Sequence, residues 1–193
     1  MKRQLILLCL ASLLAACSGG IRSTIDIKSE GNVIPFVEKG SWATVQKALF
    51  SGANVPDQNH ALRWITIRNY DFDAAKTNPN SDKLTAPEQV KIFLSLHDDA
   101  GTGIETPIKP ATYKGGKSPG PMTFELINVY VFRDGKEQRL YMYPSQQADP
   151  ASCEVKIISV DGDTIKGEIN VSGKQDGKEF LVKGPFTAQV YKR

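Results

Sequence analysis

Three Asp-Gly pairs, at residues 134–135, 161–162 and 176–177, each separate two short runs in which apolar and polar residues alternate. A two-residue type I′ turn needs positive φ at both central positions, and Asp-Gly pairs meet this requirement at low cost. Alternation with period two is typical of strands that bury one face. We therefore predict three β-hairpins, which constrain the chain from residue 122 onward to an antiparallel meander.

The preceding part of the chain also favours strands. Residues 61–69 are rich in Trp, Ile and Thr, and residues 90–97 place apolar side chains at every second position. Residues 41–52 fit a short helix capped by Ser41 and a strand equally well, and residues 98–121, rich in Gly and Pro, are expected to be a long loop. About eight or nine strands in all predict an all-β fold, namely a single antiparallel β-sandwich or a half-open barrel.

The N-terminus carries a processing signal. Lys2 and Arg3 precede an uncharged run of 12 residues, Leu5 to Ala16, which is too short for a membrane-spanning helix of about 20 residues. The run ends in Leu-Ala-Ala-Cys at residues 14–17, which closely resembles the lipobox of bacterial lipoproteins. The resemblance implies that Cys17 receives a diacylglycerol group, becomes the first residue of the mature chain, and holds it at the membrane.

The same resemblance implies a location. In Gram-negative lipoproteins, aspartate after the cysteine tends to retain the protein in the inner membrane. This chain has Ser18 there, so we expect a lipid anchor in the outer membrane, with the domain facing the periplasm or the cell surface. We expect a signal peptide at residues 1–16, the lipidated cysteine and a tether at 17–39, and a β-rich domain at 40–193.

Cysteine use and charge exclude several classes. Of the three cysteines, Cys9 leaves with the signal peptide and Cys17 carries the lipid, so Cys153 is expected to have no disulfide partner within the chain and to be a small buried residue rather than a reactive thiol. The chain has 24 basic and 21 acidic residues, and without Lys2 and Arg3 the balance is 22 against 21. A nearly neutral domain argues against a nucleic-acid partner.

Catalytic and cofactor motifs are scarce. The sequence has no G-x-S-x-G elbow, and its Gly-Lys-Ser at 116–118 lacks the rest of a phosphate-binding loop. His60 and His97 are expected to be surface residues of a turn and a strand end. The oxygen-rich segment 71–82 does not have the spacing of a calcium-binding loop. We therefore expect no catalytic residues, metal site or cofactor.

The remaining candidate site is aromatic. Tyr141 and Tyr143 share one face of a strand and are the residues expected to line a groove, although such aromatics also form cross-strand pairs in many sheets. The favoured interpretation is a non-catalytic binding or structural module of the bacterial envelope, in contact with the membrane through its lipid and with an envelope protein. The alternatives are a carrier of small hydrophobic ligands with a barrel-like cavity and, third, a hydrolase of envelope polymers.

Overall fold

The computed structural model describes residues 23–52, 55–73, 78, 80–116 and 120–191. Within these residues the chain forms strands and two short 3-10 turns, η1 (Pro144–Gln146) and η2 (Pro150–Ser152), which confirms the all-β prediction. The described strands number eleven, more than the eight or nine expected. They are β1 (Asp26–Ser29), β2 (Asn32–Ile34), β3 (Gly40–Gly52), β4 (Val55–Arg68), β5 (Val90–His97), β6 (Ala111–Gly115), β7 (Thr123–Arg133), β8 (Lys136–Met142), β9 (Glu154–Asp161), β10 (Thr164–Gln175) and β11 (Lys178–Val190).

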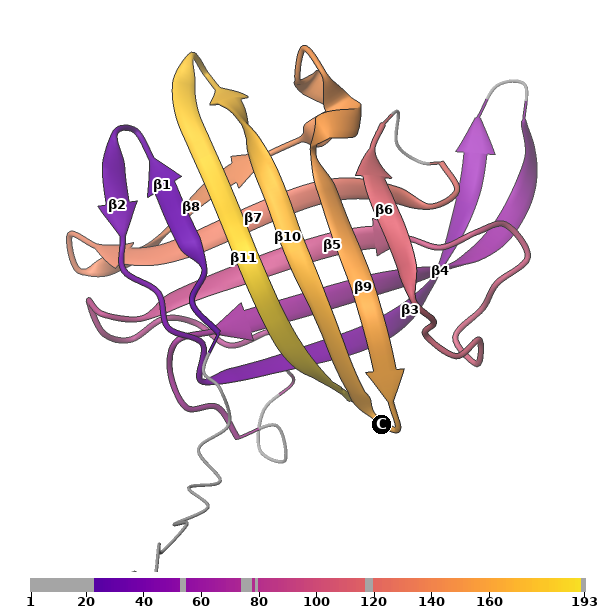
Figure 1. The fold of residues 1–193 in the computed structure, drawn as a ribbon, viewed down its shortest axis with the longest axis horizontal. Coiled ribbons are helices and arrows are strands. Elements are labelled where there is room, and N and C mark those ends of the chain that lie inside the picture. Colours follow the sequence, from indigo (N-terminus) through magenta and orange to yellow (C-terminus); the bar gives the residue numbers. More distant parts are fainter. Residues whose placement is uncertain (1–22, 53–54, 74–77, 79, 117–119, 192–193) are drawn as a thin grey trace, which may run out of the picture.

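The strands belong to one mixed sheet that folds over into two layers (Figure 1). One layer has the order β2-β1-β11-β10-β9-β6, and the other has the order β8-β7-β5-β4-β3. The layers are joined at two corners, where β6 pairs with β7 and β11 with β3 in parallel, through two residue pairs each. In Figure 1 the strands of the two layers cross steeply, as in an orthogonal sandwich. The predicted sandwich or half-open barrel is therefore confirmed.

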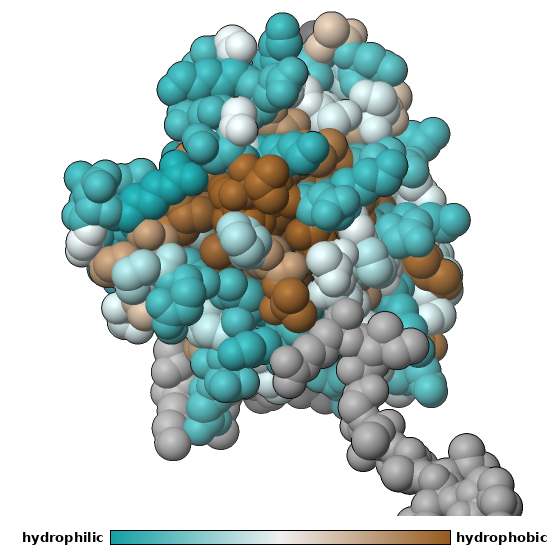
Figure 2. Space-filling view, turned by 60° about the vertical axis from the view of Figure 1, so that its left-hand side comes forward, coloured by the Kyte–Doolittle hydropathy of each residue, from teal (hydrophilic) through white to brown (hydrophobic). Residues whose placement is uncertain are grey.

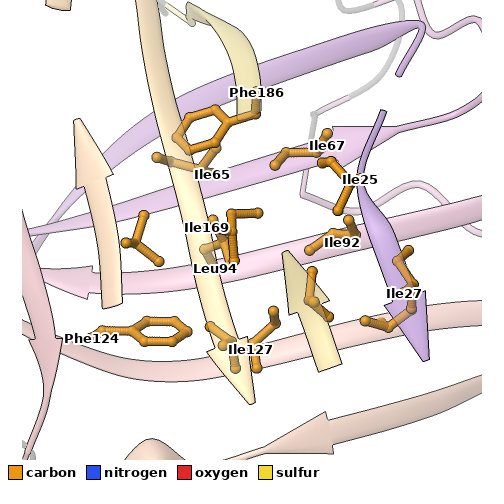
Figure 3. Packing of buried hydrophobic residues seen from close by; sticks show 14 of the residues in the cluster. Ile25, Ile27, Ile65, Ile67, Ile92, Leu94, Phe124, Ile127, Ile169 and Phe186 are labelled. Carbon is orange, nitrogen blue, oxygen red and sulfur yellow. The ribbon is translucent and has the colours of Figure 1, made fainter. Parts of the chain in front are cut away.

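The hydrophobic core lies between the layers, because alternate side chains of each strand point inward. In Figure 3, Ile169 of β10 and Phe186 of β11 lie over Ile65 of β4 and Leu94 of β5, and each of these four side chains is exposed by 1% or less. Complete burial of one such side chain contributes about 1.5–3 kcal/mol relative to the exposed state. Contact between the layers is therefore what stabilises the strands that the alternation predicts.

The predicted hairpins form. Residues 134–135 join β7 to β8 and residues 176–177 join β10 to β11, with φ between +51° and +78° at all four positions. The third hairpin is shifted by one residue, since β9 extends through Asp161 and the turn consists of Gly162 and Asp163. Gly162 has φ +56° at the first central position, where a type II′ turn needs glycine.

The structure decides one open alternative, between helix and strand, and corrects one predicted loop. Residues 40–52 form strand β3, so the helical alternative is wrong; β3 pairs antiparallel with β4, which offers a pleated partner that outweighs local propensity. Residues 111–115 form strand β6 inside the segment 98–121 that was expected to be a loop. The sequence does not predict β6 because Gly- and Pro-rich stretches flank its central Tyr113. The strand forms because it pairs with β9 through four residue pairs.

The folded part begins earlier than residue 40, so the expected tether at 17–39 is too long. β1 and β2 form a hairpin around Glu30 and Gly31, whose φ values are +54° and +79°. Ile25 and Ile27 are 1% exposed and belong to the core, packed beside β11. The sequence obscures this hairpin because its strands are only four and three residues long.

Candidate binding site

An apolar hollow opens on the side of the sandwich where β2 faces the ends of β5 and β7. Its volume is about 540 Å³. Figure 2 shows this side of the molecule, with an apolar area flanked by polar surface. We call this feature the apolar hollow; its lining residues are Val33, Ile34, Pro35, Phe36, Val37, Lys39, Asn69, Pro87, Glu88, Val90, Val131, Phe132 and Arg133.

Strand-like alternation explains why residues 33–37 have apolar side chains on both sides. Ile34 and Phe36 point inward and are 7% and 4% exposed, whereas Val33 and Val37 point outward and are 69% and 45% exposed. A valine side chain with this exposure loses much of the free energy that its burial would contribute. Two such residues on one short segment therefore mark a surface suited to apolar contact.

The rim of the apolar hollow carries more positive than negative charge. Lys39 and Arg133 line it together with Glu88. Lys28, on β1, is the direct cross-strand partner of Val33 and is exposed. Among the described residues, Lys28, Lys39 and Arg133 therefore stand at this surface with two carboxylates, Glu88 in the lining and Glu30 in the β1–β2 turn, whose charge interacts with Arg133.

Tyr141 and Tyr143, the residues expected to line a groove, lie together at the edge of β8. Their ring centroids are 5.7 Å apart with an interplanar angle of 72°, and the Arg139 guanidinium lies 4.9 Å from the Tyr141 ring centroid. Tyr141 lines a small hollow of about 140 Å³ between β8 and the β10–β11 hairpin, whereas Tyr143 is not among its lining residues. A role in ligand binding for this pair stays a prediction.

The expectation that His60 and His97 lie on the surface is wrong. They are 0% and 5% exposed, and Nε2 of His60 lies 2.7 Å from Nδ1 of His97. Oε2 of Glu125 lies 2.9 Å from Nε2 of His97 and accepts a hydrogen bond of 2.9 Å from the Ser95 hydroxyl. Sequence reasoning missed this cluster because its members are brought together by the pairing of β4, β5 and β7 and are far apart in the chain.

A second buried cluster lies at the end of β5. Arg63, 1% exposed, donates through Nε and Nη2 to Oδ2 of Asp98, at 2.9 and 2.5 Å, and the Tyr113 hydroxyl donates to Oδ1 at 2.5 Å. Burial and the Asp98 charge raise the pKa of Tyr113. Because β6 contributes Tyr113 and β4 contributes Arg63, this cluster ties the two layers together.

A third cluster fastens residues 80–85 over the outer face of β4 and β5. Arg68, with a completely buried side chain, donates to both carboxylate oxygens of Asp82 at 2.9 and 2.8 Å, and Tyr70 and Lys91 donate to the same residue. Burial alone would raise the pKa of Asp82, but the hydrogen bonds from Arg68 and Tyr70 hold it below its usual value. Asp82 thus serves an ion-pair network.

The polar side chains of the segment considered for calcium also form hydrogen bonds within the fold. Its Asn80 side chain accepts from Thr66 at 3.3 Å and donates to Thr44 at 2.8 Å. Among the residues that the structure describes, no group of three or more His, Cys, Asp or Glu side chains is placed to hold a metal ion.

The cysteines divide as follows. Cys17 lies outside the described residues, so the lipobox prediction stays a prediction. Cys153 is completely buried and unbridged, as expected, and its thiol donates to the Ser172 carbonyl at 3.4 Å. Burial raises the pKa of this thiol, which favours its unreactive protonated form.

Comparison with protein-family models, curated proteins and solved structures finds no match to this chain. Within the described ranges, none of the helical segments is long and apolar enough to cross a bilayer.

Proposed function

We propose that this chain is a lipid-anchored protein of the bacterial outer membrane and acts as a non-catalytic binding module, with the apolar hollow as its binding surface. The observation that carries the proposal is the outward exposure of Val33 and Val37 beside a hollow of about 540 Å³. Solvent-exposed apolar surface rimmed by polar residues is typical of interaction sites. The anchor rests on the lipobox resemblance around Cys17.

The chemistry of the apolar hollow supports binding rather than catalysis. Its polar lining consists of Lys39, Asn69, Glu88 and Arg133, which do not include a nucleophile paired with a base. The acids and bases of the three buried clusters already bond to one another inside the fold. They are therefore used to hold the sandwich together.

A carrier of small hydrophobic ligands is the second candidate. The volume of the apolar hollow falls within the range of about 300–1,000 Å³ that is usual for ligand pockets. A carrier would retain a bound molecule after gentle purification, and native mass spectrometry of the intact protein would detect the added mass. A binding module would give the mass of the lipidated chain alone.

Photo-crosslinking in intact cells tests the main proposal. A photoreactive residue at Val33 is expected to crosslink to an envelope component, whereas the same residue at Ile158, which is 46% exposed on β9, is expected to crosslink weakly. Equal crosslinking from both positions would argue against a site at the apolar hollow. A labelled fatty acid is expected to be incorporated into the wild type and not into the Cys17→Ala variant, and equal labelling of the two would contradict the lipid anchor.

A further inference from the structure

We propose that the apolar hollow docks onto the surface of the lipid bilayer next to the anchor, so that the occupant of the binding site is membrane lipid. This inference rests on the proposed function, because it assumes that Cys17 is lipidated. The inference names the partner of the apolar hollow. Three observations support it: the position of the anchor, the short β2 edge strand and the charge of the rim.

The anchored end of the chain lies beside the apolar hollow. Ser23, the first described residue, accepts a hydrogen bond of 3.0 Å from the Glu38 backbone N–H, and Thr24 forms a β-bridge with Val37. Six peptide units separate Cys17 from Ser23 and span at most about 22 Å when fully extended. A lipid on Cys17 therefore keeps Val37 close to the bilayer surface.

The β2 edge is poorly suited to a protein strand. β2 has three residues, pairs with β1 on one side, and is followed directly by Pro35, which has no N–H to donate. Short edge strands ended by proline are a common means of preventing strand addition. An occupant that contacts Val33 and Val37 without backbone hydrogen bonds fits this edge better, and acyl chains meet that condition.

The charge of the rim matches a lipid surface. Lys39 and Arg133 line the apolar hollow and Lys28 stands beside Val33, whereas Glu88 lines the hollow and Glu30 interacts with Arg133, so that among the described residues the rim carries a small excess of positive charge. Basic side chains next to a membrane are attracted to anionic headgroups. Because the anchor already holds the domain at high local concentration, even a weak contact of this kind orients it.

Fluorescence quenching in proteoliposomes tests the inference. The full lipidated chain carries an environment-sensitive label at Val33→Cys, or at Ile158→Cys on β9, four strands away from β2 in the sheet. The vesicles contain phosphatidylglycerol and lipids with a nitroxide near the acyl carbonyl. The label at position 33 is expected to be quenched several-fold more strongly than the label at position 158, and less strongly in vesicles of neutral lipid.

The outcomes separate this inference from the function on which it rests. Equal quenching at both positions in protein that floats with the vesicles overturns bilayer docking and leaves the anchored binding module intact. Crosslinking of position 33 to a single envelope protein, without quenching, assigns the apolar hollow to that protein instead. If the wild-type protein is recovered in the soluble fraction without attached lipid, the anchor is overturned, and bilayer docking is overturned with it.

Replacing Lys39 and Arg133 by glutamine separates the charge contribution from the apolar one. Lys183→Gln together with Lys174→Gln, on strands β11 and β10, is the charge-matched control. The first pair is expected to lower quenching at position 33 on anionic vesicles, and the control pair is not. Equal loss in both variants would contradict the specific role of the rim.

Discussion

His60 and His97 share a hydrogen bond inside the protein, with 2.7 Å between Nε2 of His60 and Nδ1 of His97. Nε2 of His97 also lies 2.9 Å from a carboxylate oxygen of Glu125, which only accepts hydrogen bonds when ionised. A neutral His97 therefore carries its hydrogen on Nε2, and its Nδ1 accepts. It follows that His60 donates from Nε2, so the carboxylate sets the tautomer of both rings.

Nitrogen-detected NMR of the two imidazoles checks this assignment. We expect both His60 and His97 to be Nε2–H tautomers, since the sequence contains two histidines and both can be assigned by single substitutions. A hydrogen on Nδ1 of His97 would contradict the proposed direction of the bond. The Glu125→Gln variant is the informative comparison, because an amide can donate and thereby releases His97 from this constraint.

The same bond predicts a stability effect. His60→Phe keeps a ring in the site but removes the donor to buried Nδ1 of His97, and we expect it to lower the free energy of unfolding by about 1–3 kcal/mol. Urea unfolding measures the change. Asn59→Ala, at the exposed neighbouring position, is the control and should change stability by no more than about 0.5 kcal/mol.

Replacement of Asp82 should destabilise the protein in a pH-dependent manner. Asp82→Asn removes the carboxylate that binds the buried Arg68 guanidinium and lies 3.6 Å from Lys91, which keeps Glu137 at 3.7 Å, and we expect a loss of about 3 kcal/mol near neutral pH. The pKa of Asp82 is lowered in the folded state from the ordinary value of 3.8, so its stabilising contribution is complete above that pH. It is lost as the pH falls through the lowered pKa.

Urea unfolding at several pH values measures this difference between the wild type and Asp82→Asn. The two proteins should converge in stability as the solution is acidified below about pH 4. Asp71→Asn, at an exposed position near the start of the same loop, is the matched control. A pH-independent gap between wild type and Asp82→Asn would show that the loss comes from packing rather than from charge.

Gly167 should not tolerate a side chain. A Cβ at this position would lie 2.4 Å from the Phe186 ring and 2.5 Å from the Lys156 carbonyl oxygen, at the point where the β9–β10 register shifts. We expect Gly167→Ala to cost about 1–3 kcal/mol in thermal or urea unfolding, because the core must move aside. Gly40→Ala, where no atom lies within 4 Å of the added carbon, should be close to neutral.

Two tyrosines should resist ionisation in alkaline solution. Burial, with Asp82 or Asp98 as neighbour, raises the pKa of Tyr70 and Tyr113 well above the usual value of 10.0. Because the raised pKa favours the protonated phenol in the folded state, this contribution to stability is present below pH 10 and is lost as the pH rises further. Absorbance at the phenolate band should therefore change equally, near pH 10, in wild type, Tyr70→Phe and Tyr113→Phe. A smaller change in either variant would contradict burial of that hydroxyl group.

The sequence was sufficient for those features that depend on neighbouring residues. Asp134 and Asp176, each followed by glycine, mark turns in which positive φ is a local requirement, and both hairpins form at the predicted positions. The alternation in 90–97 likewise predicts β5 at its observed bounds. For residues 41–52 the local pattern allowed two structures, and the partner strand β4 decided between them.

The sequence by itself determined the all-β class and the hairpins at 134–135 and 176–177, because turn geometry and period-two alternation act over a few residues. The burial of Cys153 followed from the number of cysteines rather than from local structure. Only the tertiary structure decided which polar residues meet and where apolar surface is left exposed. His60 and His97 stand 37 positions apart. The apolar hollow combines 33–37 with 131–133 from the facing layer. Such neighbours are set by how the two layers cross and close at their corners, and that arrangement depends on contacts across the whole core.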